Sequence, residues 1–91
     1  MHITMVTRIM PGGSPCRKCG EARQYLASKG YWDRIDEVVE ADIADPESPG
    51  LKLASQHGVE LAPFFIVRDG DTETVYTSVV ALVRTMLASS P

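Results

Sequence analysis

The stretch Pro-Gly-Gly-Ser-Pro-Cys-Arg-Lys-Cys, residues 11–19, contains the only two cysteines of the chain, Cys16 and Cys19. An apolar run over residues 3–10 precedes it, and a helical pattern follows it. A Cys-x-x-Cys pair that leaves a strand and opens a helix is typical of a redox site. The stretch therefore predicts thiol–disulfide chemistry where a strand meets a helix.

The first half of the chain alternates between expected strands and helices. A buried strand is expected to end near Ile9, and a proline and two glycines follow it. Ser14 and Pro15 offer a cap and a favoured first helical residue, so we expect a helix from about Pro15 or Cys16 to Gly30. Residues 35–43, where apolar residues alternate with acids, indicate a second strand.

The second half adds a helix, a hairpin and a last helix. A short helix is expected to end near His57, with Gly58 as its stop. The apolar run of residues 64–67 indicates a central strand, and Asp69-Gly70 is a hairpin signal before a returning strand over residues 72–76. Ser78 is expected to cap the last helix. The apolar positions of that helix are Val79, Leu82, Val83 and Met86.

The order of these elements predicts the fold class. The first strand, helix and second strand imply a right-handed crossover to a parallel neighbour, and the hairpin adds an antiparallel pair. We therefore expect an α/β fold with a mixed four-stranded sheet and helices on both faces. A length of 91 residues predicts a single domain over residues 1–91.

Composition narrows the classes of partner. The chain is 44% hydrophobic and 23% charged, which excludes a disordered or collagen-like chain. Its net charge of −3 argues against nucleic acid as a partner. No apolar run approaches the roughly 18–20 residues that span a bilayer, and the first residues show no signal peptide. We therefore expect a cytoplasmic protein, where a cysteine pair is more often catalytic or metal-binding than a structural disulfide.

The positions of the two cysteines predict different roles. Residues three apart on a helix share a face at roughly 5–6 Å between Cβ atoms, within reach of a disulfide. At the helix start, unpaired N–H groups and the macrodipole favour the Cys16 thiolate, and Arg17 and Lys18 add positive charge. We expect the pKa of Cys16 to lie below about 8.5 and Cys19 to be more buried and less acidic. Cys16 is therefore the expected nucleophile and Cys19 the resolving thiol.

Two motifs make the chain resemble the thioredoxin superfamily, and its glutaredoxin branch more than thioredoxin itself. They are Cys16 to Cys19 after the first strand and Leu-Ala-Pro-Phe-Phe at residues 61–65 before the third. The resemblance implies a thioredoxin-like fold of the glutaredoxin type, βαβαββα. It also implies a cis peptide bond before Pro63, next to the cysteines, and pairing of the Ala62 backbone with a bound peptide or thiol.

The resemblance further implies a thiol–disulfide oxidoreductase that exchanges its dithiol with a disulfide-containing protein or a low-molecular-weight thiol. The expected substrate-binding residues are Arg17, Lys18, Ala62, Pro63 and Ser78. Glutathione stays open as a co-substrate, and neither a metal nor a resident cofactor is expected. Dithiol glutaredoxins usually have Pro-Tyr between the cysteines and Gly-Gly-Asp or similar before the last helix, where this chain has Arg-Lys and, at residues 76–78, Tyr-Thr-Ser.

Other interpretations of Cys16 and Cys19 stay open. A structural zinc site needs four ligands. The remaining candidates in one chain are His2 and His57, which are distant from the motif in sequence, and a dimer that shares four cysteines is the other route to such a site. An iron–sulfur cluster bridged by Cys16 and glutathione is a further alternative. The rival from another class is a non-enzymatic binding module with the same fold, whose cysteines are idle or hold a metal.

The basic residues before and between the cysteines also have two interpretations. Arg8, Arg17 and Lys18 form either a solvated basic corner or a site for an anionic partner. Tyr31 and Trp32, after the first helix, are expected to cover the core rather than to form a binding patch.

Overall fold

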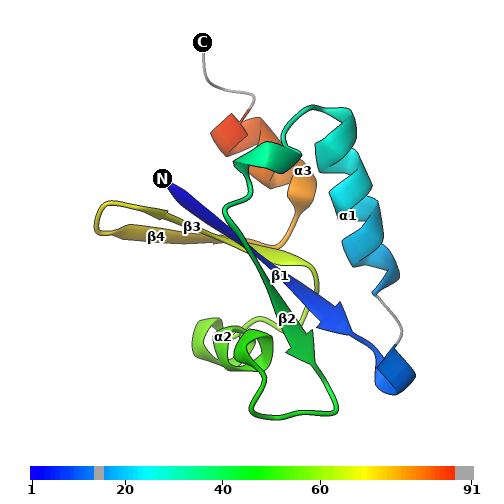
Figure 1. Ribbon diagram of the computed structural model, residues 1–91. Helices are drawn as coiled ribbons and strands as arrows, with labels where there is room; N and C mark the ends of the chain where they lie inside the picture. Colours follow the sequence, from blue (N-terminus) through cyan, green and yellow to red (C-terminus); the bar gives the residue numbers. More distant parts are fainter. Residues whose placement is uncertain (14–15, 88–91) are drawn as a thin grey trace.

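Strand β1 (His2–Ile9) is an inner strand of a four-stranded sheet in the computed structural model, which describes residues 1–13 and 16–87 (Figure 1). The sheet order is β2-β1-β3-β4. Strand β1 runs parallel to β2 (Glu37–Asp42) and antiparallel to β3 (Phe64–Asp69), and β4 (Thr72–Tyr76) completes the sheet antiparallel to β3. The predicted mixed four-stranded sheet is confirmed.

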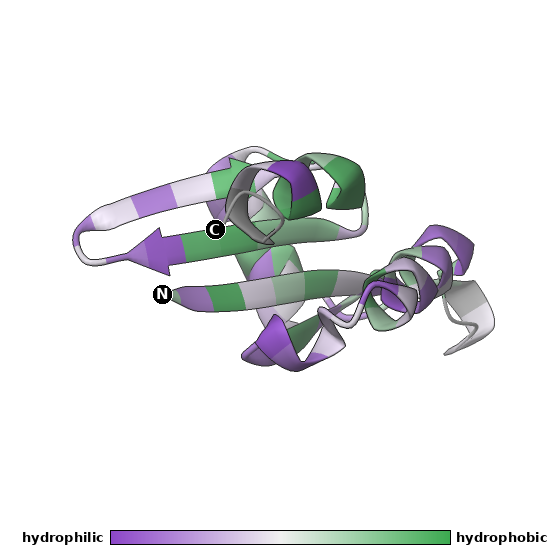
Figure 2. Ribbon diagram, turned by 90° about the horizontal axis from the view of Figure 1, so that it is seen from above, coloured by the Kyte–Doolittle hydropathy of each residue, from purple (hydrophilic) through white to green (hydrophobic). Residues whose placement is uncertain are grey.

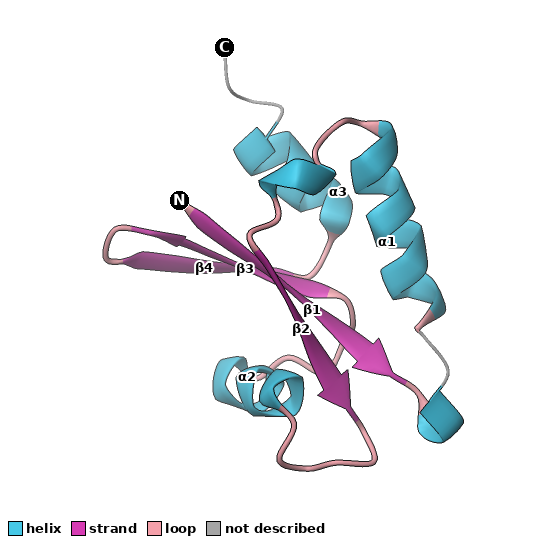
Figure 3. Ribbon diagram, viewed as in Figure 1, coloured by secondary structure: helices cyan, strands magenta, loops and turns pink. Residues whose placement is uncertain are grey.

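Helices cover both faces of this sheet, as the sequence predicts. Helix α1 (Arg17–Ser28) and helix α3 (Val79–Leu82) lie on one face, and helix α2 (Pro49–His57) lies on the other (Figures 1 and 3). The helix ends follow the predicted signals, because Gly30 and Gly58 both adopt positive φ after α1 and α2. The Ser78 hydroxyl accepts a hydrogen bond from the N–H of Ala81 and so caps α3.

The alternation of side chains along β1 and β3 divides the core into two layers. Met5 and Phe65 pack with Leu26 of α1 and Leu82 of α3, whereas Phe64 packs with residues of α2. Full burial of one such side chain is worth about 1.5–3 kcal/mol. Figure 2 shows β3 as hydrophobic over most of its length, whereas the neighbouring strand β4 contains hydrophilic residues as well as hydrophobic ones. This difference matches a central strand next to an edge strand.

The structure corrects three predicted boundaries. Strand β2 covers residues 37–42 and is therefore shorter than the predicted residues 35–43. A 3-10 helix over residues 32–34 precedes it. Next to the strand start, the Ile3 N–H donates a hydrogen bond to the side chain of Asp36. The hairpin loop is Gly70-Asp71 rather than Asp69-Gly70, because Asp69 pairs with Thr72. Gly70 takes a φ of 62° at the first loop position, which favours glycine.

The third correction concerns the last helix, which is not a continuous α-helix. Its α-helical part ends at Leu82, and Val83–Leu87 form a π-helical turn, which is wider than an α-helical turn. Leu82 and Val83, although consecutive, are both buried. The Met86 side chain, the predicted cap and first helical residue at positions 14 and 15, and the predicted fraying of residues 89–91 lie outside what the structure describes.

No helix among the described residues is both long enough and apolar enough to cross a lipid bilayer.

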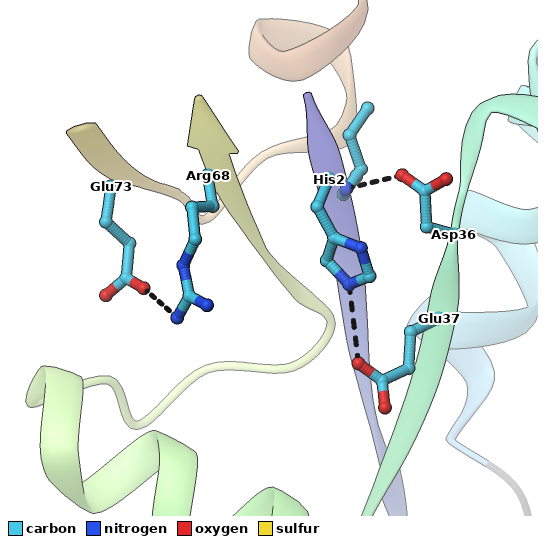
Figure 4. A network of polar contacts seen from close by, with 6 residues as sticks. His2, Asp36, Glu37, Arg68 and Glu73 are labelled. Atoms are coloured by element: carbon cyan, nitrogen blue, oxygen red, sulfur yellow. Dashed lines mark hydrogen bonds and ion pairs between the residues drawn. The ribbon is translucent and has the colours of Figure 1, made fainter. Parts of the chain in front are cut away.

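Polar side chains join the strands at the end of the sheet where β1 begins (Figure 4). His2 lies 3.4 Å from Glu37 of β2, and Arg68 of β3 lies 2.9 Å from Glu73 of β4. His57, at the end of α2, lies 3.3 Å from the same Glu73. The eight residues of β1, at about 3.3 Å each, separate this network from the end of the strand near the cysteines. We therefore assign it to the packing of α2 and the strand edges.

The start of α2 lies against the end of β2. The Ser48 hydroxyl accepts a hydrogen bond from the Asp42 N–H at 3.0 Å. Gly50 is buried two residues later, and a Cβ atom there would lie 2.6 Å from the Cα atom of Ala41 and closer still to the neighbouring backbone. Only glycine therefore fits at this contact between helix and strand.

The Gly50→Ala variant is expected to lower the free energy of unfolding by about 1–3 kcal/mol, because rigid backbone must move to admit the methyl group. Gly20→Ala, in the first turn of α1, is the matched control. A Cβ at Gly20 meets no atom within 4 Å, so alanine is expected to raise stability by about 0.5–1 kcal/mol. Denaturant unfolding of both variants measures the difference, and equal effects of the two substitutions would contradict the close contact.

Candidate active site

Cys16 is the N-cap residue of α1. Its backbone is extended, with φ −70° and ψ 126°, and its sulfur accepts a hydrogen bond from the Cys19 N–H at 3.4 Å. The first N–H groups of a helix have no partner within the helix. The sulfur therefore occupies the position in which an N-cap side chain normally accepts, and negative charge on it is stabilised there.

Cys19 lies one turn further into α1 and is buried, with 6% of its surface exposed. Its sulfur accepts a hydrogen bond from the backbone N–H of Arg8 at 3.4 Å. This contact joins the first turn of α1 to the carboxyl end of β1. Both cysteines are free thiols.

The surroundings of the two sulfurs shift their pKa values in opposite directions. Burial raises the pKa of Cys16, but hydrogen bonds from the Cys19 side chain and from the N–H groups of Cys19 and Lys18, with the charge of Arg8, lower it by more. The pKa of Cys16 therefore lies below its ordinary value. Burial and the hydrogen bond to Cys16 raise the pKa of Cys19 to about 12. The arrangement keeps one proton on the inner sulfur and favours a thiolate at the outer one.

The peptide bond between Ala62 and Pro63 is cis, as the sequence resemblance implied. The ladder between β1 and β3 ends at the pair Val6 and Phe64. Pro63 therefore directly precedes the last pair of this ladder, and the Arg8 N–H that binds the inner sulfur lies two residues after Val6 on β1. The cis peptide and the cysteines lie at the same end of the sheet.

Two cavities flank α1 at this end. The first, called here the cis-proline groove, has a volume of about 340 Å³ and lies between α1, the segment before β3 and the start of α3. Its walls include Lys18, Tyr25, Leu61, Ala62, Pro63 and Thr77. The second, called here the dithiol cavity, has a volume of about 220 Å³ and lies between α1, β1 and β2. Its walls include Thr7, Ile9, Cys16, Cys19, Arg23 and Glu40.

The predicted substrate-binding residues fall into two groups. Lys18, Ala62 and Pro63 line the cis-proline groove. The Arg17 side chain is 93% exposed, pairs with Glu21 at 3.4 Å and is not among the residues that line either cavity. The Ser78 hydroxyl caps α3, and the neighbouring Thr77 lines the groove instead.

Sequence reasoning underrated Arg8 and missed Arg23 and Glu40. The Arg8 guanidinium donates to the Glu60 carbonyl at 2.5 Å, and its charge acts on both sulfurs. The Arg23 guanidinium lies 4.9 Å from the centre of the Trp32 ring. The available signal was the spacing of Arg23 four residues after Cys19, which puts both on one face of the helix. Glu40 had no local signal, because its position depends on the register of β2 against β1.

The described residues contain no group of three or more His, Cys, Asp or Glu side chains arranged to hold a metal ion. His2 and His57, the candidate completing ligands, pair with Glu37 and Glu73.

Comparisons with known proteins find one partial similarity. No protein-family model matches the chain, and no solved structure matches it. L-threo-3-hydroxyaspartate ammonia-lyase from Pseudomonas sp is 37% identical to the chain over 59 residues, which cover 65% of the chain and 16% of that enzyme. The chain thus matches about a sixth of the length of this curated relative. Because the match covers so small a part of that enzyme, it does not indicate that the present chain has the same activity.

Alkylation of the reduced protein tests the difference between the sulfurs. Because the pKa of Cys16 is lowered, we expect iodoacetamide to modify Cys16 first, with a pH midpoint below that of a free cysteine. Arg8→Gln is expected to raise this midpoint, whereas Arg17→Gln, which removes an exposed charge, leaves it unchanged. Peptide mass mapping against pH measures both, and earlier modification of Cys19 would refute the assignment.

The raised pKa of Cys19 also predicts how stability depends on pH. Its pKa rises from an ordinary value near 9 to about 12, so between these values the unfolded chain loses a proton that the folded chain keeps. The unfolded state then binds fewer protons, and the free energy of unfolding falls as pH increases above 9. We expect this fall to be steeper for the reduced wild type than for Cys19→Ala in denaturant unfolding. Parallel curves would show that burial does not hold this proton.

Proposed function

We propose that the chain is a thioredoxin-like protein of the glutaredoxin type that acts as a thiol–disulfide oxidoreductase. The observation that carries this proposal is the pair of sulfurs at the N-cap and in the first turn of α1, one with a lowered and one with a raised pKa, at the same end of the sheet as a cis peptide bond. The element order β1, α1, β2, α2, β3, β4, α3 supports the same fold. A reducing, cytoplasmic setting belongs to the proposal, because it keeps such a pair reduced.

The reaction follows from the order in which the sulfurs become nucleophiles. The Cys16 thiolate attacks one sulfur of a substrate disulfide, forms a mixed disulfide and releases the first substrate thiolate. Cys19 then loses its proton to solvent and attacks Cys16, which forms the intramolecular disulfide and releases the second thiolate. The two thiolates take up protons, so two electrons pass from the dithiol to the substrate.

The cis-proline groove is the proposed docking site for the substrate. Its wall combines the exposed Leu61, which is 61% accessible, with the backbone of Ala62 and the cation of Lys18. An extended peptide or a small thiol would contact the Ala62 backbone while its sulfur meets Cys16. Glutathione stays open as a co-substrate, with Thr77 rather than Ser78 beside it.

Trapping tests this function. Reduced wild-type protein is expected to cleave 2-hydroxyethyl disulfide, and Cys16→Ser to lose this activity by at least a hundredfold, because the resolving sulfur is buried and protonated. Cys19→Ser is expected to accumulate a mixed disulfide on Cys16, which intact-protein mass spectrometry detects.

Two results would contradict the assignment. Full activity of Cys16→Ser would exclude the proposed nucleophile. An inactive wild type that contains stoichiometric zinc or iron when purified without chelator would favour the metal-holding binding module.

A further inference from the structure

The dithiol cavity gives a second approach to the sulfurs. It shares no wall residue with the cis-proline groove, because the groove lies on the α3 side of α1 and the dithiol cavity on the β2 side. Both Cys16 and Cys19 line it, whereas neither lines the groove. A small molecule in this cavity would therefore contact the sulfurs without entering the docking site proposed above.

The walls of the dithiol cavity carry opposite charges. Arg23 extends from α1, and its guanidinium is positioned over the Trp32 ring at 4.9 Å. Glu40 extends from β2, where Thr7 is its partner in the register with β1. Among the described residues, neither Arg23 nor Glu40 forms an ion pair. Arg8 also lines the cavity, but its guanidinium donates a hydrogen bond to the Glu60 carbonyl. The cavity thus offers the cation of Arg23 and the anion of Glu40, neither of them in an ion pair, beside two sulfurs.

We infer that this cavity binds the zwitterionic half of an amino-acid disulfide of the cystine class. This inference rests on the proposed function and names its small-molecule substrate. The guanidinium of Arg23 suits a carboxylate because it offers two parallel N–H donors, and Glu40 suits the ammonium group. The volume of about 220 Å³ holds about seven water-sized groups at roughly 30 Å³ each, and half of cystine has about that many heavy atoms.

The charges orient the disulfide toward Cys16. With its carboxylate at Arg23 and its ammonium group at Glu40, the half-cystine directs its sulfur toward Cys16. Attack by the Cys16 thiolate forms the protein–cysteine mixed disulfide and releases one cysteine thiolate. Attack by Cys19 then releases the second cysteine, and the released thiolates take up protons. The dithiol supplies both electrons, so one turnover needs no other reductant.

Single-turnover kinetics with four disulfides test this specificity. The substrates are cystine, cystine dimethyl ester without carboxylates, N,N′-diacetylcystine without ammonium groups, and neutral 2-hydroxyethyl disulfide. Each rate constant is divided by that of the same disulfide with dithiothreitol, because the pKa of the leaving thiol changes intrinsic reactivity. After this correction, cystine is expected to react about threefold or more faster than each masked derivative, the factor expected of one partly exposed ion pair.

Variants assign each part of the preference to one wall. Arg23→Gln is expected to remove the difference between cystine and its dimethyl ester, and Glu40→Gln the difference between cystine and its diacetyl derivative. Lys29→Gln, at the C-cap of α1, and Glu37→Gln on β2 make the same charge changes outside the cavity, and both are expected to keep the preference.

The outcomes separate this inference from the proposed function. Equal corrected rates for all four disulfides would overturn the amino-acid specificity and leave the oxidoreductase function intact. A variant that slows the neutral disulfide as much as cystine would show an effect on the thiolate, and would also overturn the binding role. A wild type that fails to react with the neutral disulfide would overturn the proposed function itself.

Discussion

The hydrogen bond from the Arg8 N–H to the Cys19 sulfur is the contact on which the arrangement of the site depends. It joins the first turn of α1 to the carboxyl end of β1, in addition to the core packing of α1 against the sheet through Leu26. The inner sulfur is thereby fixed at the strand end, and the outer sulfur lies at the helix N-terminus one turn away. The difference between the two thiols thus follows from where a strand ends and a helix begins.

Burial and hydrogen bonding compete at both sulfurs, and the balance differs between them. At Cys16 burial is the largest single influence on the pKa, but several hydrogen-bond donors and the charge of Arg8 together outweigh it. At Cys19 burial outweighs the hydrogen bond from the single N–H of Arg8. Charge on the side chains between the cysteines contributes little, because Arg17 is almost fully exposed and pairs with Glu21. The backbone therefore has more influence on the thiolate than the basic residues that the sequence makes conspicuous.

Much of the fold could be predicted from local signals in the sequence. The apolar run of β1, the glycines after α1 and α2, and the Ser78 cap each depend on neighbours in the chain, and each was found where expected. The cysteine spacing likewise located the candidate site. Local patterns did not predict that Glu40 and Arg23 line the same cavity, because their positions depend on the register of β2 and on the packing of α1. The π-helical turn after Leu82 also left no mark in the apolar periodicity.

The proton on Cys19 has a consequence for the timing of the proposed reaction. Two of the causes that raise its pKa, the hydrogen bond to Cys16 and the negative charge of that sulfur, exist only while Cys16 is free. When Cys16 enters a mixed disulfide, its charge is lost and only burial continues to oppose ionisation of the inner thiol. In the proposed reaction, Cys19 therefore becomes more acidic once Cys16 is in a mixed disulfide. Formation of the mixed disulfide thus favours the Cys19 thiolate that attacks it in the next step.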